Sequence, residues 1–195
     1  MSNNFIQIIP NALSKSDCDS IIEAIEYKLS GPKAKGIYYD NNSDRNDLSV
    51  FPNMFQSLEA SNDLIADTIK TNKPLWWNGN KEHYMYLENI KLQKAQAGGG
   101  FTALHCEQGS SQMTAARFMV WMIYLNDVPK GGRTNFPLQE VSFKPTAGTL
   151  LYWPAAYTHM HQSTNDLESD KYIATGWFSY ASGLKGPFID KLQSE

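Results

Sequence analysis

The feature that most constrains the fold is an apolar run in the second half of the chain. It covers residues 118–125 and reads Phe-Met-Val-Trp-Met-Ile-Tyr-Leu, so both of its faces are hydrophobic when it is extended. A strand that is apolar on both faces must be covered on both, as the inner strands of layered sheets are. The sequence therefore predicts a central, covered strand over residues 117–126, with further layers on either side of it.

Shorter strands are predicted around this run, separated by turn residues. A strand is expected over 83–96, where apolar and polar residues alternate, and the glycine triplet 98–100 that follows is interpreted as a turn. After the apolar run, four more strands are expected at 133–136, 141–143, 148–153 and 171–180. The second half of the chain thus has the serial short strands of a sandwich or jelly roll.

The first part of the chain has a different pattern. A short strand over 5–9 precedes a helix, for which Ser14 has the side chain of an N-cap. Residues 33–49 lack either periodicity and are expected to form a long loop, and a second helix is expected over 51–70. Helices followed by strands indicate the α+β class.

A single domain is expected for a chain of 195 residues. We place its β core at about residues 83–180, and the N-terminal strand and helices within residues 1–75. The interpretation of residues 1–195 as one unit agrees with the absence of any repeat or linker-like stretch in the sequence.

Composition argues against several classes of function. The formal net charge of −3 and the lack of basic clusters make nucleic acid an unexpected partner. No apolar run approaches the roughly 20 residues of a spanning helix, so no membrane partner is expected. With two cysteines and no secretory pattern at the first residues, we expect a reducing, cytoplasmic location. The sequence gives no prediction of the oligomeric state.

The clearest chemical pattern is a histidine and a carboxylate two positions apart, His105 and Glu107. In an extended segment these side chains point to the same face. A later histidine, His159 or His161, can supply a third ligand, and two histidines with one carboxylate form the open facial site of non-haem Fe(II) oxygenases. A closed structural zinc site needs four protein ligands, commonly thiolates, which this sequence does not supply.

A lysine at the start of the last strand adds a second element. Lys171 follows His161 by ten positions. A buried lysine near a metal could pair with the far carboxylate of a dicarboxylic acid, whereas the alternative is a strand-end lysine that reaches solvent.

These residues resemble those of the iron(II) and 2-oxoglutarate dependent dioxygenases, most closely the prolyl 4-hydroxylase-like branch, over roughly residues 83–180. The matching elements are His105-x-Glu107, Arg117, the segment 124–128, the segment Gly131-Gly132-x-Thr134-x-Phe136-Pro137, Pro145, Gly148, His161, Lys171 and Trp177. The resemblance implies a double-stranded β-helix (jelly roll) with the N-terminal helices packed on one sheet.

The resemblance also implies roles for individual residues. Metal ligands would be His105, Glu107 and His161, because the ten-residue spacing to Lys171 matches His161 and not His159. The 2-oxoglutarate pocket would contain Lys171, on the C5 carboxylate, and Tyr124. Thr175 and Trp177 share a strand face with Lys171 and are expected to line the same pocket, with ordinary core packing as the alternative. The family usually has aspartate in the first motif, so Glu107 is one methylene longer than expected.

The activity implied is that of a hydroxylase. It would use Fe(II), 2-oxoglutarate and O₂, with ascorbate as a further candidate cofactor, and would release succinate and CO₂. A peptidyl proline or another protein side chain is the expected substrate, by analogy with the family. The alternatives are an oxygenase acting on a small metabolite or a nucleobase, and a non-catalytic or cupin-like metal-binding β-helix module.

Overall fold

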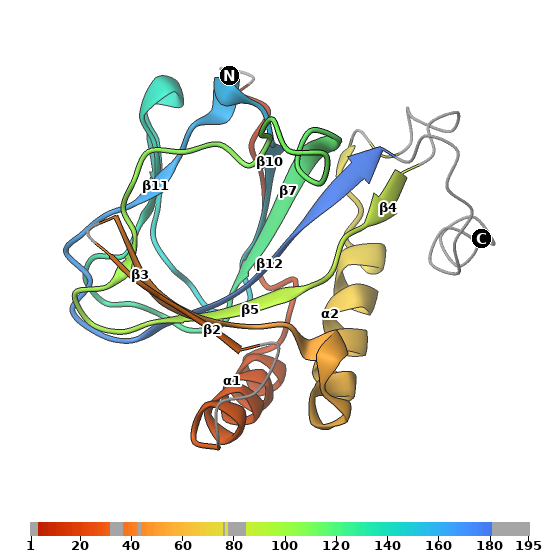
Figure 1. Cartoon of the computed structure of the whole chain (residues 1–195), viewed down its shortest axis with the longest axis vertical. Coiled ribbons are helices and arrows are strands. Elements are labelled where there is room, and N and C mark those ends of the chain that lie inside the picture. Colours follow the sequence, from red (N-terminus) through yellow and green to blue (C-terminus); the bar gives the residue numbers. More distant parts are fainter. Residues whose placement is uncertain (1–3, 32–36, 43, 76, 78–84, 181–195) are drawn as a thin grey trace.

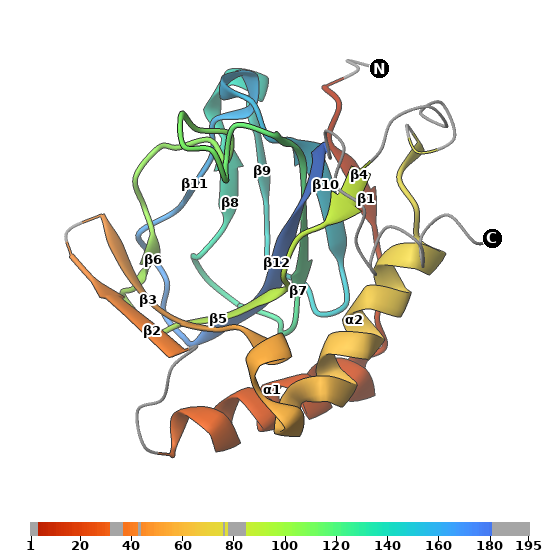
Figure 2. The same ribbon diagram turned by 45° about the vertical axis from the view of Figure 1, so that its right-hand side comes forward.

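The computed structural model describes residues 4–31, 37–42, 44–75, 77 and 85–180. In this part of the chain, two helices lie against one face of a large sheet, and a small sheet lies on the opposite side (Figures 1 and 2). The helices are α1 (Lys15–Leu29) and α2 (Glu59–Thr71). This arrangement agrees with the predicted α+β class and with the prediction that the helices pack on one sheet.

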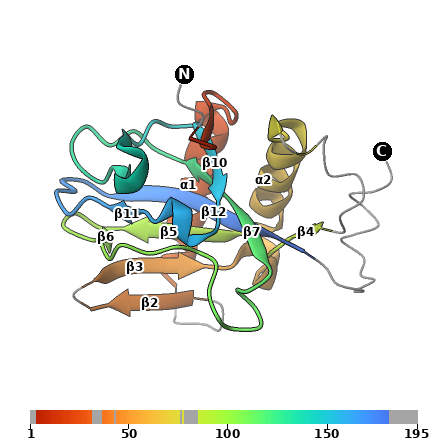
Figure 3. The ribbon, with the colours of Figure 1, turned by 90° about the horizontal axis from the view of Figure 1, so that it is seen from above.

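The large sheet has nine strands, and every pairing in it is antiparallel. In order across the sheet these are β1 (Gln7–Ile9), β10 (Leu150–Pro154), β7 (Arg117–Tyr124), β12 (Lys171–Tyr180), β5 (Lys91–Ala95), β3 (Arg45–Val50) and β2 (Ile37–Asn41). Two short strands lie off this path, β4 (Met85–Leu87) on β12 and β6 (Gly100–Phe101) on β3. Viewed from above, β2 and β3 form the edge beside β5 (Figure 3).

The small sheet has three strands and faces the large one. Its order is β11 (Gln162–Ser163), β8 (Thr134–Phe136) and β9 (Val141–Phe143). The four strands that were predicted after the apolar run are all present, with their ends within about two residues of the expected positions.

The apolar run forms β7, and its predicted central place is confirmed, because β7 pairs with both β10 and β12. Its side chains alternate between two cores. Trp121 and Ile123 belong to the core beneath the helices, whereas Val120, Met122 and Tyr124 belong to the core that faces the small sheet. Both faces of β7 are therefore covered, as the absence of polar positions in the run indicated.

The first helix begins where the sequence predicted. Ser14 is the N-cap, and its side chain accepts a hydrogen bond from the backbone N–H of Asp17 at 3.1 Å. The buried side chains of α1, which recur at helical spacing, are Cys18, Ile21 and Ile25. They belong to the core beneath the helices, called the helix-side core below. The helix thereby covers the face of the sheet opposite the small sheet.

The prediction of a long loop over 33–49 is wrong for the residues that the structure describes. A hairpin of β2 and β3 lies there, and β3 continues the sheet onto β5. The hairpin was not predicted because its sequence is polar, yet one of its charged residues, Asp47, is only 5% exposed. Its partners lie on its own strand and on the distant strand β5. Its carboxylate accepts hydrogen bonds from Arg45, Ser49 and Gln93. Long-range pairing of this kind overrides local propensity.

The second helix begins later than predicted. Two 3₁₀ turns, Pro52–Met54 and Gln56–Leu58, precede α2, and Phe55 between them is extended (φ −138°, ψ 119°). Phe55 is not helical, and its ring packs against the core. Lys28 covers this ring, with its Nζ 3.9 Å from the ring centroid.

The strand expected over 83–96 is divided. Residues 88–90 separate β4 from β5, and positions 83 and 84 lie outside the described residues. At the break, Glu88 accepts hydrogen bonds from Arg117 while Ile90 turns into the core beneath the helices. In the parts of the chain that the structure describes, neither helix has the length and apolar character that crossing a membrane requires.

Candidate active site

Backbone hydrogen bonds hold together the two segments that carry the candidate metal ligands. His105 lies between β6 and β7, and His161 directly precedes β11. The N–H of His105 donates to the carbonyl oxygen of His161 at 3.0 Å, and the N–H of His161 donates to that of His105 at 2.8 Å. The N–H of Glu107 donates to the carbonyl oxygen of Ala155 at 3.1 Å. These bonds fix all three side chains relative to the end of β10.

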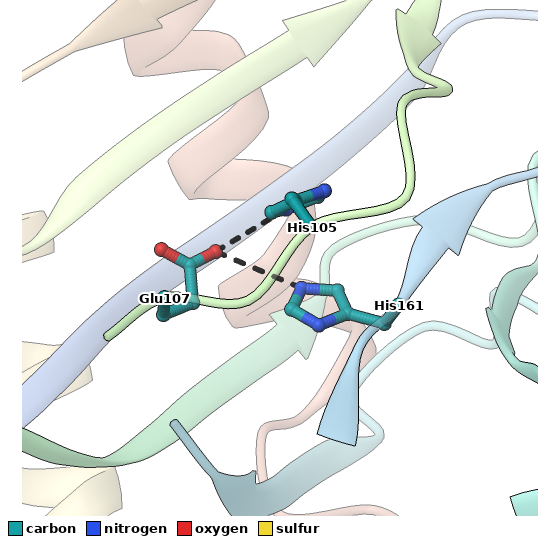
Figure 4. A group of neighbouring side chains, drawn as sticks. All are labelled: His105, Glu107 and His161. Carbon is teal, nitrogen blue, oxygen red and sulfur yellow. Dashed lines mark ion pairs between the residues drawn. The ribbon is translucent and has the colours of Figure 1, made fainter. Parts of the chain in front are cut away.

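The side-chain atoms of these residues converge on one point (Figure 4). Glu107 Oε1 lies 3.5 Å from His105 Nε2 and 3.6 Å from His161 Nε2. One donor atom from each residue lies within 4.8 Å of the others. Among the described histidines, cysteines and acids, this is the one group of three close enough to hold a metal ion.

Each histidine is oriented by its second ring nitrogen. His105 Nδ1 lies 2.8 Å from the carbonyl oxygen of Ala103, and His161 Nδ1 lies 3.1 Å from that of His159. A carbonyl oxygen can only accept, so these contacts assign the proton of the neutral ring to Nδ1. Both Nε2 atoms are then left with lone pairs that point at the carboxylate, which is how metal-binding histidines are arranged.

The carboxylate of Glu107 is held in its charged form. Burial alone would raise its pKa, but when His105 and His161 also carry a proton on Nε2, their hydrogen bonds and positive charge outweigh burial and hold the pKa of Glu107 well below its usual range. Its second oxygen, Oε2, accepts a hydrogen bond from Trp177 Nε1 at 2.9 Å and lies 3.7 Å from an Arg117 nitrogen. Oε1 is thereby directed toward the two histidines.

This donor set fits Fe(II). Two imidazole nitrogens and one carboxylate oxygen on one side of an ion leave the remaining octahedral positions open for a chelating co-substrate and O₂. Thiolates are absent from the group, as expected for such a site and unlike closed structural zinc sites.

The three donors open into a cavity of about 250 Å³ between the two sheets. Lys171 lines the same cavity, and the residue is only 7% exposed. Its Nζ donates to the carbonyl oxygen of Gly132 and to Ser163 Oγ, each at 2.9 Å. The alternative of a strand-end lysine that reaches solvent is therefore wrong.

Burial lowers the pKa of Lys171 to about 8, and the charge of Asp47 offsets this shift only in part. Its hydrogen bond to Gly132 depends on a tight turn in which Gly131 and Gly132 have φ of 76° and 60°. A Cβ on Gly131 would lie 1.9 Å from the carbonyl oxygen of Asp166. Glycine is thus required for the loop that brings this carbonyl to the lysine.

Comparison with known proteins gives the same picture. The sequence model of the 2OG-Fe(II) oxygenase superfamily matches residues 90–179, a span that includes the three donors and Lys171. A probable prolyl 4-hydroxylase 7 from Arabidopsis thaliana is 25% identical over 87% of this chain and 61% of its own length. The human prolyl 4-hydroxylase subunit alpha-1 is 30% identical over 33% of this chain and 13% of its own. These matches make the chain similar to the 2OG-Fe(II) oxygenases, and among them to prolyl hydroxylases.

Solved structures of low sequence identity share the fold of this chain. A prolyl hydroxylase from Trichoplax adhaerens, in complex with a peptide fragment of the hypoxia inducible factor oxygen degradation domain, has a TM-score of 0.72 at 16% identity, over 98% of this chain and 87% of the other. The viral collagen prolyl hydroxylase of Paramecium Bursaria Chlorella virus-1, in its 2OG complex, has a TM-score of 0.64 at 18% identity, over 92% and 98%.

A match to the 2OG-Fe(II) oxygenases implies Fe(II), 2-oxoglutarate and O₂, as the sequence indicated. The chain spans less than two thirds of the length of the curated relatives described above.

The remaining residues that were predicted for the pocket, Thr175, Trp177 and Tyr124, do not all face the cavity. Thr175 and Trp177 both line the cavity, and Thr175 Oγ1 donates to the carbonyl oxygen of Trp121 at 2.9 Å. Tyr124 is fully buried and is not among the lining residues. Its hydroxyl donates to Thr134 Oγ1 at 2.6 Å, and Thr134 is the residue of this pair that faces the cavity. Burial raises the pKa of Tyr124 above its ordinary value.

Two residues near the ligands lie outside the group. His159 Nε2 contacts the carbonyl oxygen of Asn4 at 2.9 Å, and its Nδ1 contacts Thr158 Oγ1 at 3.0 Å, so both nitrogens are occupied. The carbonyl oxygen of His159 orients His161, as noted above. Cys106 points away from its neighbours, and its thiol donates to the carbonyl oxygen of Gln108 at 3.2 Å.

Sequence reasoning missed three charged residues of the cavity wall, namely Arg45, Asp47 and Lys91. It noted a fourth, Arg117, only as a family match. Arg45 and Asp47 were assigned to a loop. Lys91 could have been found from strand parity, because it alternates with the buried Leu92 on β5 and therefore faces away from the helix-side core.

Proposed function

We propose that this protein is an Fe(II)- and 2-oxoglutarate-dependent hydroxylase that acts on a peptidyl proline or another protein side chain. One observation carries the proposal, namely that two imidazole nitrogens and a carboxylate oxygen converge in a cavity that also contains the buried cation of Lys171. A metal site alone would need no such cation.

In the proposed reaction, Fe(II) with 2-oxoglutarate and O₂ supplies the oxidant, one oxygen atom enters a C–H bond of the substrate, and the other leaves in succinate together with CO₂. His105, Glu107 and His161 hold the metal through three protein ligands. Lys171 pairs with the C5 carboxylate of 2-oxoglutarate, in a charge-assisted contact that is stronger than one between neutral groups. Thr134, held by Tyr124, and Thr175 flank the same pocket.

The wall beside Glu107 is suited to orient a substrate. The guanidinium carbon of Arg117 lies 3.8 Å from the centroid of the Trp177 ring, and Arg117 is fixed by hydrogen bonds to Glu88 at 2.8 to 3.1 Å. A flat aromatic wall with a fixed donor next to the reactive centre can position a small ring such as proline and exclude water from it.

The peptide substrate rests on the relatives. The Trichoplax prolyl hydroxylase was solved with a peptide fragment, and the curated relatives are prolyl 4-hydroxylases. A small metabolite remains the rival substrate, and the formal charge of −3 disfavours nucleic acid.

The proposal extends to the architecture. Two facing antiparallel sheets with the site between them are consistent with a double-stranded β-helix, formed by one domain over residues 1–195 with its β core at about 83–180. A cytoplasmic location and a role for ascorbate stay predictions.

A non-catalytic or cupin-like metal-binding module is the alternative from another class. It leaves the buried Lys171 without a purpose, because a metal in such a module needs no dicarboxylate partner. For this reason we favour the hydroxylase.

Turnover tests the choice directly. Protein loaded with Fe(II) without oxygen is given 2-oxoglutarate and then O₂, and succinate is quantified with and without a panel of proline-containing peptides. The hydroxylase is expected to form succinate, and to form it faster when a substrate peptide is present. The mass of that peptide should rise by one oxygen atom, about 16 Da. A protein that binds metal but forms no succinate with any member of the panel would support the binding module.

A further inference from the structure

A second cavity adjoins the metal cavity on the side of Trp177. It has a volume of about 510 Å³ and is lined by residues of β4, the segment after it and the start of α2, including Tyr86, Glu88 and Asn62. Both cavities are lined by Lys91, Arg117 and Trp177. Because Trp177 donates to Glu107, this junction lies next to the candidate metal ligands, on a path by which a substrate could approach them.

Lys91 and Lys171 lie at different ends of the metal cavity. On the paired strands β5 and β12, Lys91 is opposite Thr175, whereas Lys171 is opposite Ala95. The two positions are separated by four residues along the sheet, or roughly 13 Å at the usual rise of a strand. One bound 2-oxoglutarate, with its far carboxylate on Lys171, therefore leaves Lys91 at the end that continues into the second cavity.

The other cations in the cavity wall have partners within the protein, which for Lys171 are the carbonyl oxygen of Gly132 and Ser163 Oγ, and for the two arginines are acids. Arg45 Nε lies 2.9 Å from Asp47 and 3.0 Å from Asp40, and Arg117 is paired with Glu88 at 2.8 Å. By contrast, no described residue offers Lys91 Nζ a hydrogen bond or an ion pair within 4.0 Å. Lys91 is half-buried, so its ammonium faces the cavity with its donors free for a ligand.

The environment of Lys91 agrees with this reading. Burial, followed by the charge of Arg45, lowers its pKa to about 8, and Asp47 and Glu107 offset the shift only in part. The group is still mainly protonated at neutral pH. With metal and co-substrate bound, the charges of Fe(II), Glu107, 2-oxoglutarate and Lys171 balance one another, and Lys91 remains as a positive charge with no ion pair of its own, because Asp40 and Asp47 both contact Arg45.

We propose that the substrate carries a carboxylate that pairs with Lys91 at the junction of the two cavities. The inference rests on the proposed hydroxylase function and narrows its substrate class. A carboxylate fits better than a phosphate, because Lys91 is a single cation and the nearby arginines are already paired with acids. In addition, Glu88 lines the second cavity and would repel a dianion. The carboxylate can be the free acid of a small molecule or chain end, or an acidic side chain within a peptide.

Matched pairs of acid and amide test the assignment by binding, without turnover. The protein is loaded with Mn(II) and 2-oxoglutarate in the absence of O₂, and calorimetry measures the affinity of N-acetyl-L-proline against N-acetyl-L-prolinamide, and of acetyl-Pro-Asp-amide against acetyl-Pro-Asn-amide. In at least one pair, we expect the dissociation constant of the acid to be lower than that of its amide by about tenfold or more. A preference in the first pair identifies a free carboxylate, and one in the second an acidic side chain.

Variants assign the preference to the lysine. It should disappear in Lys91→Met and persist in Lys91→Arg. It should also persist in Lys70→Met, which removes the same charge from the partly exposed surface of α2. Equal or undetectable binding of both members in every pair overturns the inference, as does a preference that survives in Lys91→Met. Weaker binding of 2-oxoglutarate to Lys91→Met would show that Lys91 binds the co-substrate, and this result would also overturn the inference. Failure of the proposed function is separate, because wild-type protein would then not bind 2-oxoglutarate.

Discussion

The indole Nε1 of Trp177 donates a hydrogen bond of 2.9 Å to Oε2 of Glu107, and so fixes which oxygen of the carboxylate faces the two histidines. Trp177 comes from the long strand β12, whereas Glu107 lies in an irregular segment before β7. A rigid strand thus orients a ligand from a loop. Outer partners of this kind align metal ligands and raise metal affinity.

Removal of this hydrogen bond should weaken metal binding. In Trp177→Phe the aromatic wall is kept but Oε2 loses its donor, and we expect the dissociation constant for Fe(II) or Mn(II) to rise by about tenfold or more. Calorimetric titration without oxygen measures it. Trp77→Phe is the matched control, because Trp77 packs on Phe178 in the helix-side core. An unchanged metal affinity in Trp177→Phe would contradict this role.

The length of Glu107 should matter as well. In Glu107→Asp the side chain is one methylene shorter, so it cannot hold both the contact with Trp177 and the positions 3.5 and 3.6 Å from the two Nε2 atoms without movement of the backbone. We predict weaker metal binding than in wild type, although aspartate is the usual residue of the family motif. Tighter binding by Glu107→Asp would show that the geometry is not adapted to glutamate.

Binding of 2-oxoglutarate should depend on pH through Lys171. The buried lysine has a pKa of about 8 in the free protein, and a bound carboxylate raises it, because the charged form gains a partner. Affinity should therefore be constant below pH 8 and fall above it, by about tenfold per unit at most, as binding must take up a proton. Titrations in buffers of different ionisation enthalpy measure that proton.

The control for this effect is Lys171→Met, in which the decline above pH 8 should disappear together with most of the affinity. A decline of the same slope in Lys171→Met would assign it to another group.

The glycine turn beside Lys171 should be essential for stability. Gly131→Ala places a Cβ 1.9 Å from the carbonyl oxygen of Asp166, at a φ of 76°. We expect the free energy of unfolding to fall by about 2 kcal/mol or more, measured by chemical denaturation. Gly98 has the same φ of 76° and no atom within 4 Å of its Cβ position, so Gly98→Ala isolates the backbone strain from the clash. Equal losses in the two variants would contradict a role for the close contact.

The parts of the fold that the sequence predicted are those with a local cause. The run that became β7 has no polar position on either face, and Ser14 caps α1 by contacts within one turn. The β2–β3 hairpin could not be predicted in this way. Asp47 is paired with Arg45 on its own strand, but its carboxylate also accepts a hydrogen bond from Gln93, which is 46 positions away and which local sequence does not reveal.

The candidate site divides along the same line. His105, Glu107, His161 and Lys171 were found from spacing and resemblance, and the structure brings them to one cavity. Strand parity alone did not separate His159 from His161, which differ because the 3₁₀ turn Tyr157–His159 directs His159 toward Asn4. Lys91 was missed because its importance depends on which strands pair and on the fact that no described acid lies within ion-pair distance of its Nζ.

The central claim is that His105, Glu107 and His161 hold an iron that binds 2-oxoglutarate. The most direct test is the visible spectrum of the anaerobic protein with Fe(II) and 2-oxoglutarate, in wild type, His161→Ala and His159→Asn. We predict a weak charge-transfer band in wild type and in His159→Asn, and no band in His161→Ala. A band of unchanged intensity in His161→Ala would contradict the account.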